Sequence, residues 1–351
     1  MNKTHNPKSY ILKQNSKVFE AVEILQHNPL KVVAIIDQKN KLCGSITDGD
    51  VRRGLLNGKT LDSTCSEIMN KKPCHAPQDD HKKIQSIIND KDIDNPILVN
   101  QNKEIIAIYN GSKHTIVNTK PNKIFIMAGG EGKRLLPLTL DTPKPMLMIN
   151  DKPIIDIIIS RFVEFGFSDI NISVRYKSAQ LINYFKNHKN TNLDIKFYEE
   201  KKPLGTAGSL SLLNKSNLNE PVIVINGDIL TKVDFHQLLH FHKKSKSMIT
   251  LCAAEYITSI PFGIMNLKKG KLINITEKPV NKNLINAGIY VVDPSIIKKM
   301  KKNVRIDMTS LIEEHMGKSA ISVFPLHETW VDIGNKDDYF NAQKISYKQS
   351  D

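Results

Sequence analysis

The chain has 351 residues and a formal net charge of +14, with 40% hydrophobic and 25% charged residues. This composition is typical of a globular protein, and the length is enough for two domains. No apolar run approaches the roughly 20 residues that cross a bilayer, and the first fifteen residues lack the apolar core of a signal peptide. We therefore expect a cytoplasmic protein with no membrane partner.

The positive charge comes mostly from lysines scattered along the chain, and arginine is rare. Proteins that read bases rely on arginine and on interleaved aromatic residues. We therefore expect no nucleic-acid partner, although a charge of this sign alone would allow one. The four cysteines stand at neither C-x-x-C nor zinc-ligand spacing, which indicates thiols in a reducing compartment.

Residues 1–117 contain a weak internal repeat. A helix-period run (NSKVFEAVEILQHN) precedes two strand-like runs (KVVAIID, KLCGSIT), and the same order recurs in DDHKKIQSIIND, PILV and EIIAIYN. Aligning Lys41 with Lys103 gives an offset of 62 residues (103 − 41). Units this small that cannot each bury a full core usually pack on one another. We expect an α+β tandem pair.

The segment GSITDGDVRRGL resembles a CBS domain, and the whole region a CBS pair, a fold that often binds adenine nucleotides. The resemblance implies that Thr47 and Asp50, at the end of the second strand, hold a ribose, since a carboxylate can accept two sugar hydroxyls. Asp50 could instead cap a helix that starts at Val51. The second repeat has Tyr109 and Ser112 in these places, so at most one ribose site is expected. A purely structural or dimerising module is the alternative.

A polar stretch that contains Pro121 indicates a linker, which we place at residues 118–122. In residues 123–351, strands rich in Ile and Val alternate with helical stretches. This alternation predicts an α/β domain with a mostly parallel, doubly wound sheet. Such sheets bind ligands at the carboxyl ends of strands, near a switch in strand order. A Gly-rich segment directly follows the first strand and fits such a site.

That segment, IFIMAGGEGKRLLPLT, matches neither the P-loop nor the dinucleotide-binding fingerprint. Its glycines, Gly129, Gly130 and Gly132, could still let backbone amides approach phosphates. Arg134 would add a fixed fork for phosphate oxygens. A tight basic turn without a ligand is the alternative.

Three further charged residues stand in constrained surroundings. Lys144 lies between two prolines, which indicates a rigid extended segment. Asp228 ends the apolar strand PVIVINGD, and Asp332 lies in ETWVDIG. Two carboxylates that converge beside a polyphosphate commonly hold Mg²⁺. Taken singly, each Asp could be a cap or turn residue.

Ordered matches across residues 123–345 resemble the sugar nucleotidyltransferase family. The matching segments are MAGGEGKRLLPLT, TPKPML, LGTAGSL, INGD, FGIM, ITEKP, NAGIYV and WVDIG. The resemblance implies a Rossmann-like, mostly parallel mixed sheet. It also implies transfer of a nucleotidyl group from an NTP to a sugar 1-phosphate, with release of pyrophosphate and without a covalent enzyme intermediate.

The resemblance implies a role for each matching residue. Arg134 and Lys144 would be catalytic and neutralise charge at the reacting phosphates, while Asp228 and Asp332 would bind Mg²⁺. The residues implied to bind the nucleotide are Ala128, Gly129, Gly130, Gly132, Gly205, Thr206, Ala207, Gly208 and Gly227. Those implied to bind the sugar phosphate are Gly263, Glu277, Lys278 and Asn286. A hairpin with a charged edge, or a plain core strand, is the alternative for this last group.

The segment LGTAGS is more similar to the guanylyltransferase branch of the family than to the thymidylyl branch. A CBS pair followed by this transferase resembles bacterial enzymes of the legionaminic acid pathway that make GDP-glucosamine from GTP and glucosamine 1-phosphate. Guanylyl transfer to mannose or heptose 1-phosphate, uridylyl transfer, and an inactive nucleotide-sensing protein stay open. CBS pairs commonly dimerise, so a homo-oligomer is expected.

Overall fold

The structure is a computed structural model that describes residues 10–27, 30–77, 80, 82–84, 86–87, 95–109, 120–187, 193–317 and 320–344. The chain divides into two units, Met1–Ile116 and Val117–Asp351, each with hydrophobic clusters of its own. Among the described helices, none combines the length and the apolar character needed to cross a membrane.

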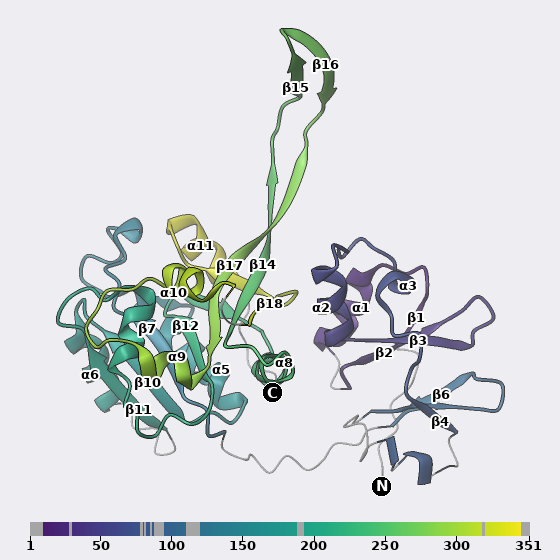
Figure 1. Cartoon of the computed structure of the whole chain (residues 1–351), viewed down its shortest axis with the longest axis horizontal. Coiled ribbons are helices and arrows are strands. Elements are labelled where there is room, and N and C mark those ends of the chain that lie inside the picture. The colour runs from purple at the N-terminus through teal and green to yellow at the C-terminus, as the bar shows by residue number, and fades with distance from the viewer. Residues whose placement is uncertain are drawn as a thin grey trace. The chain divides into compact units, whose positions relative to one another are not determined.

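The first unit contains two small sheets with the same topology (Figure 1). In each sheet the first strand runs parallel to the second, and the second runs antiparallel to the third. The elements are β1 (Ile11–Lys13), α1 (Val18–His27), β2 (Val32–Ile36), β3 (Leu42–Thr47), α2 (Asp48–Leu56), α3 (Cys65–Ile68), β4 (His75–Pro77), β5 (Ile97–Val99) and β6 (Ile105–Ile108).

The two repeats are related by an offset of 63 residues, and the expected offset of 62 is wrong. The tight turns of the β2–β3 and β5–β6 hairpins each contain one left-handed residue, Asn40 (φ 58°) and Lys103 (φ 63°), and 103 − 40 is 63. Lys41 therefore corresponds to Glu104, with which it forms a β-bridge. The alignment of Lys41 with Lys103 used residue type alone, whereas the left-handed residue of each hairpin turn defines the equivalent positions.

With this offset the positions that match Thr47 and Asp50 are Asn110 and Lys113, so the expected match to Tyr109 and Ser112 is wrong. Asn110, Ser112 and Lys113 lie outside the described residues.

The two repeats share a core, as expected for units too small to be stable alone. Ala34 and Leu42 of the first sheet cluster with Ile97 and Val99 of the second. The backbone amide of Leu42 also donates a hydrogen bond to the carbonyl of Lys103 (2.9 Å).

The start of the second unit includes part of the expected linker. Residues 118 and 119 lie outside the described residues. The amide of Lys120 donates to the carbonyl of Gly166 (2.9 Å), and the buried Asn122 side chain donates to the carbonyl of Pro221 (2.8 Å). Residues 120–122 are therefore attached to the second unit.

The second unit alternates strands and helices, with the bounds that follow. They are β7 (Ile124–Ala128), η2 (Lys133–Leu135), η3 (Lys144–Met146), β8 (Met148–Ile149), β9 (Lys152–Pro153), α5 (Ile154–Glu164), β10 (Asp169–Val174), α6 (Ser178–Asn187), β11 (Asp194–Glu199), α7 (Gly205–Gly208), η4 (Ser209–Leu212), β12 (Val222–Asn226), β13 (Ile229–Thr231), α8 (Phe235–Lys244), β14 (Ile249–Ser259), β15 (Ile264–Lys268), β16 (Lys271–Thr276), β17 (Val280–Val292), α9 (Pro294–Lys299), α10 (Met308–His315), β18 (Ile321–Pro325), β19 (Trp330–Asp332) and α11 (Lys336–Lys344).

Seven of these strands form one sheet in the order β11-β10-β7-β12-β17-β14-β18. Only β17 runs against the other six described strands of this sheet. The expected α/β fold with a mostly parallel mixed sheet is thus confirmed. After β7 the chain moves outward through β10 to β11, and it then returns to β12 on the other side of β7. The strand order therefore switches at β7, where sheets of this kind bind ligands.

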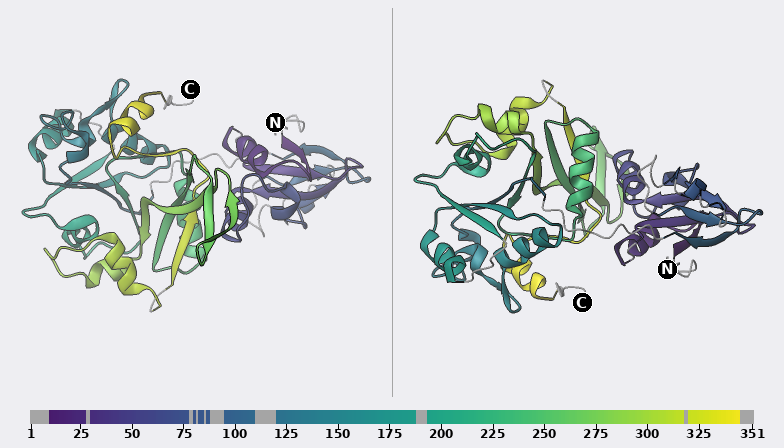
Figure 2. Two further views of the ribbon diagram at one scale, coloured as in Figure 1. Left: turned by 90° about the horizontal axis from the view of Figure 1, so that it is seen from above. Right: turned by 90° about the horizontal axis from the view of Figure 1, so that it is seen from below.

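Helices cover both faces of this sheet (Figures 1 and 2). Ile124 and Ile126 of β7 face a cluster with α5 and α8, whereas Phe125 faces a cluster with α9 and α10. Strands buried on both faces need apolar residues at every position. This explains the unbroken apolar runs in the sequence.

A long two-stranded arm extends from this sheet (Figure 1). The inner halves of β14 and β17 are buried in the sheet, and their outer halves are exposed. The hairpin of β15 and β16 continues them to the tip. We call residues 255–284 the arm.

Candidate active site

The Gly loop, residues 129–132, follows β7 at the carboxyl edge of the sheet. Gly132 has a left-handed backbone (φ 66°), and a Cβ there would lie 2.9 Å from Cγ2 of Thr139. The hydroxyl of Thr139 donates to the carbonyl of Gly132 (2.9 Å) and so holds the turn. At Gly130, a Cβ would meet no atom of the described chain within 4 Å. The turn itself requires Gly132, whereas Gly130 presents exposed backbone beside open space.

The end of β12 lies directly beside the Gly loop. The amide of Gly227 donates to the carbonyl of Met127 (2.9 Å), and a Cβ at Gly227 would come within 2.8 Å of that oxygen. Beyond it, β13 pairs with β19, with Ile229 opposite Asp332, and the amide of Ile333 donates to the carbonyl of Asp228 (3.1 Å). Asp228 and Asp332 are therefore held together at the strand-order switch.

Lys144 is fixed between two buried prolines, Pro143 and Pro145. It begins a single 3₁₀ turn, and the expected extended conformation at Lys144 is wrong. The amide of Met146 donates to the carbonyl of Pro143 (2.8 Å), and a proline is tolerated early in a helical turn because its missing N–H is not needed there. The ammonium group of Lys144 donates to Oδ2 of Asp228.

The charges of Asp228, Lys144 and Arg134 influence the pKa of Asp332. Burial and, secondarily, the nearby carboxylate of Asp228 raise the pKa of Asp332. The cationic groups of Lys144 and Arg134 oppose this shift. Arg134 lies in η2 with an exposed side chain. The structure thus brings Lys144 into contact with Asp228, and it brings Arg134 near enough to Asp332 to favour its charged form.

Two oxygens at this edge fit a hard cation. Oδ1 of Asp228 is buried and has no hydrogen-bond partner among the described residues, and the same is true of Oδ1 of Asn226. Buried acceptors are nearly always satisfied, so we expect each of these two oxygens to have a partner beyond the described residues, and a bound cation would serve. Carboxylate and amide oxygens are ligands that Mg²⁺ accepts. A Mg²⁺ ion at this position would be held by Asp228 and Asp332.

The segment LGTAGS packs against the chain's own residues 304–307. A Cβ at Gly205 (φ 76°) would lie 2.6 Å from the carbonyl oxygen of Ile306, and one at Gly208 would lie 2.4 Å from that of Val304. The amides of Ala207 and Gly208 both donate to the carbonyl of Ile306 (2.9 Å). The fold alone therefore requires these two glycines. Nucleotide contacts by Gly205, Thr206, Ala207 and Gly208 stay a prediction.

Glu200, which the sequence analysis missed, connects this segment to the Gly loop. Its Oε2 accepts from the amide of Leu204 (3.1 Å), and a Cβ at Gly129 would lie 2.9 Å from its Oε1. A single Glu in the run EEKKP carries no recognisable signal, because only the packing of β11 beside β10 brings it to the loop.

A family model for nucleotidyl transferases matches residues 123–349. The chain belongs to this family. A model for the CBS domain matches residues 5–57. The resemblances to the nucleotidyltransferase family and, over residues 5–57, to a CBS domain are thereby confirmed.

The transferase unit is also similar to named relatives and to solved structures. The chain is 31% identical over 227 residues to a mannose-1-phosphate guanyltransferase of Yarrowia lipolytica, and 30% identical over 236 residues to a mannose-1-phosphate guanylyltransferase of Arabidopsis thaliana. These alignments cover 63% and 64% of this chain and 62% and 64% of the relatives, so the chain spans less than two thirds of their length. The crystal structure of HddC from Yersinia pseudotuberculosis is similar, with a TM-score of 0.52 and 25% identity over 64% of this chain and 98% of that one.

The residues expected to bind the sugar phosphate in the transferase unit are split between two places. Gly263, Glu277 and Lys278 lie in the arm, with the two charged side chains exposed, and the arm extends away from β7 and β12 (Figure 1). The structure therefore does not bring these three to Asp228. Asn286 lies where β17 enters the sheet beyond the carboxyl end of β12, and it donates to the hydroxyl of Tyr290 (2.7 Å). Only Asn286 reaches the edge of the candidate site.

In the CBS-like unit, both carboxylate oxygens of Asp50 are engaged. Oδ2 accepts from the amide (2.9 Å) and the hydroxyl (2.7 Å) of Thr47, and Oδ1 accepts from Arg53 (2.6 Å). Helix α2 starts at Asp48, so the expected start at Val51 is wrong, and Asp50 lies inside the first turn. A cavity of about 630 Å³ lies beside Asp50 and Arg53 and is lined by Lys59 and other residues of this unit.

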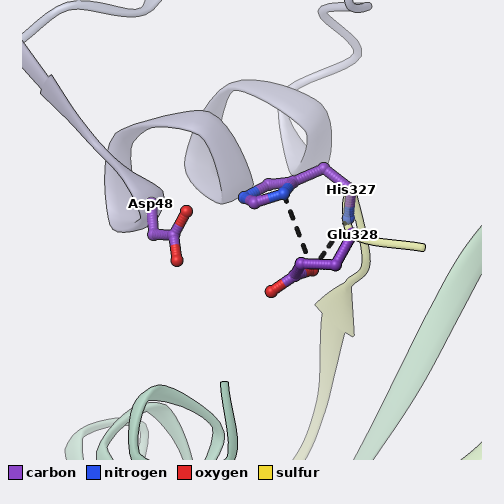
Figure 3. A group of neighbouring side chains, drawn as sticks. All are labelled: Asp48, His327 and Glu328. Atoms are coloured by element: carbon purple, nitrogen blue, oxygen red, sulfur yellow. Dashed lines mark hydrogen bonds and ion pairs between the residues drawn. The ribbon is translucent and has the colours of Figure 1, made fainter. Parts of the chain in front are cut away.

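A histidine and a carboxylate, His327 and Glu328, are neighbours in the segment that follows β18 in the transferase unit. Nδ1 of His327 lies 3.6 Å from Oε2 of Glu328, and the backbone amide of His327 donates to the same oxygen (3.1 Å; Figure 3). Figure 3 also labels Asp48, the first residue of α2 in the other unit. Two side chains from adjacent positions do not define a cation site, so we assign none to this pair.

Proposed function

We propose that the second unit transfers a nucleotidyl group from an NTP to a sugar 1-phosphate and releases pyrophosphate. The observation that carries the proposal is the contact of Lys144 with Asp228, which β13 and β19 hold next to Asp332 at the strand-order switch, beside the open backbone of Gly130. Sheets of this topology bind ligands at that place. A fixed lysine beside two carboxylates suits phosphoryl chemistry, which depends mainly on positioning and charge neutralisation.

In the proposed reaction, an oxygen of the sugar phosphate attacks the α-phosphorus of the NTP. The new P–O bond forms as the bond from that phosphorus to the bridging oxygen of the β-phosphate breaks, and pyrophosphate leaves. Backbone amides around Gly130 would hold the triphosphate, and Arg134 and Lys144 would offset its charge. Mg²⁺ bound by Asp228 and Asp332 would supply further neutralisation of phosphate charge.

Guanylyl transfer is the form of this reaction that we favour. The segment LGTAGS supports GTP as donor, and so do the curated relatives, which are named as mannose-1-phosphate guanyltransferases. A CBS-like unit ahead of the transferase supports glucosamine 1-phosphate as acceptor, with GDP-glucosamine for legionaminic acid synthesis as product. Mannose 1-phosphate is the second candidate acceptor, because the relatives carry that name.

The test incubates the protein with every combination of five NTPs and three acceptors, which are glucosamine, mannose and glucose 1-phosphate. Mass spectrometry then identifies the nucleotide sugar formed. We expect the highest kcat/KM with GTP and glucosamine 1-phosphate. Turnover with GTP and mannose 1-phosphate alone would change the acceptor and keep guanylyl transfer. Binding of GTP without any product would instead show a nucleotide sensor and overturn the proposal.

We further propose that the first unit binds an adenine nucleotide in the cavity beside Asp50. Its lining includes Arg53, Lys59 and Lys71, which suit phosphate, and the carboxylate of Asp50, which suits a ribose once Arg53 turns to the ligand. Calorimetry with AMP, ADP and ATP on the full chain and on Asp50→Ala is the test. We expect binding that the substitution weakens. Absence of binding by all three nucleotides would contradict the proposal and indicate a structural role for the unit.

A further inference from the structure

A second cavity of the first unit is rich in lysine. It has a volume of about 610 Å³, and its lining includes Lys71, Lys72, Lys83, Lys103 and His75. Among the described residues, no Asp or Glu belongs to this lining. A cleft lined by charges of one sign concentrates ions of the opposite sign, so this cavity attracts anions.

Three separate segments of the chain bring the lysines together. Lys71 and Lys72 precede β4, whereas Lys83 lies in a helical stretch between β4 and β5. Lys103 lies in the turn between β5 and β6, where its carbonyl accepts a hydrogen bond from the amide of Leu42 in the first repeat (2.9 Å). The packing of the two repeats, and not one charged run, therefore creates the cationic lining.

The lysines of this cavity differ from the cations of the cavity beside Asp50, which are already paired. There, Arg53 contacts Asp50 (2.6 Å) and Lys59 contacts Glu67 (2.8 Å), so both positive charges are offset. None of the four lysines in the second cavity forms an ion pair with a carboxylate of the described chain. An anion from solution is therefore the partner that would offset them.

We propose that this cavity binds a polyphosphate chain, either free or as part of a nucleotide. Lysine binds phosphate as a point charge, and two or three linked phosphates carry roughly three to five negative charges, which match four ammonium groups. The cavity is within the usual range of small-molecule sites, about 300–1,000 Å³. Its lining also includes the buried Leu42 and Ile87, which leave an apolar wall for an organic group.

This site is separate from the one proposed beside Asp50, and it rests neither on that proposal nor on nucleotidyl transfer. Lys71 lines both cavities, whereas Lys83 and Lys103 line only the second. Substitutions at Lys83 and Lys103 therefore distinguish the two sites.

Calorimetry of the full chain with tripolyphosphate, in the absence of Mg²⁺, tests the proposal. We expect binding by the wild type, and dissociation constants at least about tenfold higher for Lys83→Gln/Lys103→Asn, because two of the four charges are lost. Asparagine suits the left-handed turn at position 103, since Asn40 holds the equivalent place in the first repeat. No binding by the wild type overturns the proposal.

Two matched controls show whether the effect belongs to this cavity. Lys13→Gln/Lys39→Gln removes two exposed lysines of the same unit that line neither cavity, and it should bind as the wild type does. Asp50→Ala should also bind unchanged. Any binding of tripolyphosphate to the transferase unit is common to all these chains. A loss of affinity in either control as large as in Lys83→Gln/Lys103→Asn overturns the proposal.

Pyrophosphate, ATP and citrate identify the chemistry of the ligand in the same experiment. Affinity for ATP above that for tripolyphosphate, lost in Lys83→Gln/Lys103→Asn, supports a nucleotide as the source of the phosphates. Equal or higher affinity for pyrophosphate supports the free anion. Citrate carries several negative charges without phosphate, so equally tight binding of citrate would overturn the assignment to polyphosphate.

Two half-buried thiols test occupancy in the unsubstituted chain, in case a variant misfolds. Cys43 and Cys74 line the cavity, whereas Cys65 and Cys252 are buried. Saturating tripolyphosphate should slow the labelling of Cys43 and Cys74 by N-ethylmaleimide several-fold, as measured by mass spectrometry of the peptides. The reagent is neutral, so the charge of the ligand does not repel it. Equal labelling rates with and without tripolyphosphate overturn the proposal.

Discussion

Lys144 donates a hydrogen bond to one carboxylate oxygen of Asp228, while the other oxygen of that carboxylate is buried without a partner in the described part of the chain. An unsatisfied buried acceptor costs about 1–3 kcal/mol, and more when it is charged. A cation that arrives with the substrate would satisfy this oxygen. The carboxylate of Asp228 therefore binds one permanent positive charge, that of Lys144, and has a second oxygen available for another cation.

Replacing Asp228 with Asn should lower kcat/KM by roughly 10²-fold or more, because a neutral amide is a poor ligand for a hard cation. Folding should be preserved, since the shape is kept and the amide oxygen can still accept the hydrogen bond from Lys144. Steady-state rates and thermal unfolding of the purified variant measure the two effects. Asp194→Asn, which removes an exposed partner of Lys196, is the matched control and should be fully active. Equal activity of Asp228→Asn would refute the metal role.

Replacing Lys144 with Met should also lower kcat/KM by roughly 10²-fold, because the apolar stem is kept and the charge at the phosphates is lost. Lys133→Met is the control on the neighbouring turn. Its side chain is 80% exposed and pairs only with Glu131 among the described residues, so its loss should change the rate little. Similar effects of the two substitutions would indicate a general loss of positive charge and contradict a specific role for Lys144.

Two glycines of the Gly loop should respond differently to alanine. Gly132→Ala should destabilise the fold by about 1–2 kcal/mol, because the residue is left-handed and a Cβ would crowd Thr139. Gly130→Ala should leave stability unchanged within about 0.5 kcal/mol. It should nevertheless raise the KM for the NTP, since a methyl group would occupy the phosphate position. An unchanged KM in Gly130→Ala would show that the triphosphate binds elsewhere.

The buried His242 should make stability depend on pH. Burial lowers the pKa of His242 to about 4, so the folded chain keeps this ring neutral, beside the hydroxyl of Thr250 (2.8 Å). As pH falls from about 6.5 towards 4, the unfolded chain takes up this proton first, and the free energy of unfolding falls by up to about 3 kcal/mol.

His242→Gln removes the titrating group and keeps a polar partner for Thr250. Urea unfolding at pH 7 and pH 4.5 should show a smaller loss of stability in this variant than in the wild type. His240→Gln, on an exposed position of the same helix, should behave as the wild type does. The same pH response in His242→Gln would assign the acid sensitivity to other groups.

The sequence predicted the sheet and the charged centre because both depend on local pattern. The apolar run before Gly129 and the run before Asp228 identify two strand ends, and parallel strands present their ends at one edge. The sequence did not predict the 3₁₀ turn at Lys144, the role of Glu200 or the true reason for Gly205. Those features depend on which distant segment packs against each residue, and a single chain does not reveal that.

The arm shows the same limit. The motif ITEKP is recognisable in the sequence, but nothing local shows that β14 and β17 continue far beyond the sheet and carry Glu277 away from Asp228. Strand length and the exposure of a ribbon are set by long-range pairing.

Pyrophosphate release from GTP, measured with and without a sugar 1-phosphate and with Mg²⁺ or EDTA, tests the central claim most directly. We predict release only when GTP, a sugar 1-phosphate and Mg²⁺ are all present, in equal amounts with the nucleotide sugar formed. Absence of release with every NTP and sugar phosphate would contradict the account. Release that does not require the sugar phosphate would contradict it too, since it would show hydrolysis in place of nucleotidyl transfer.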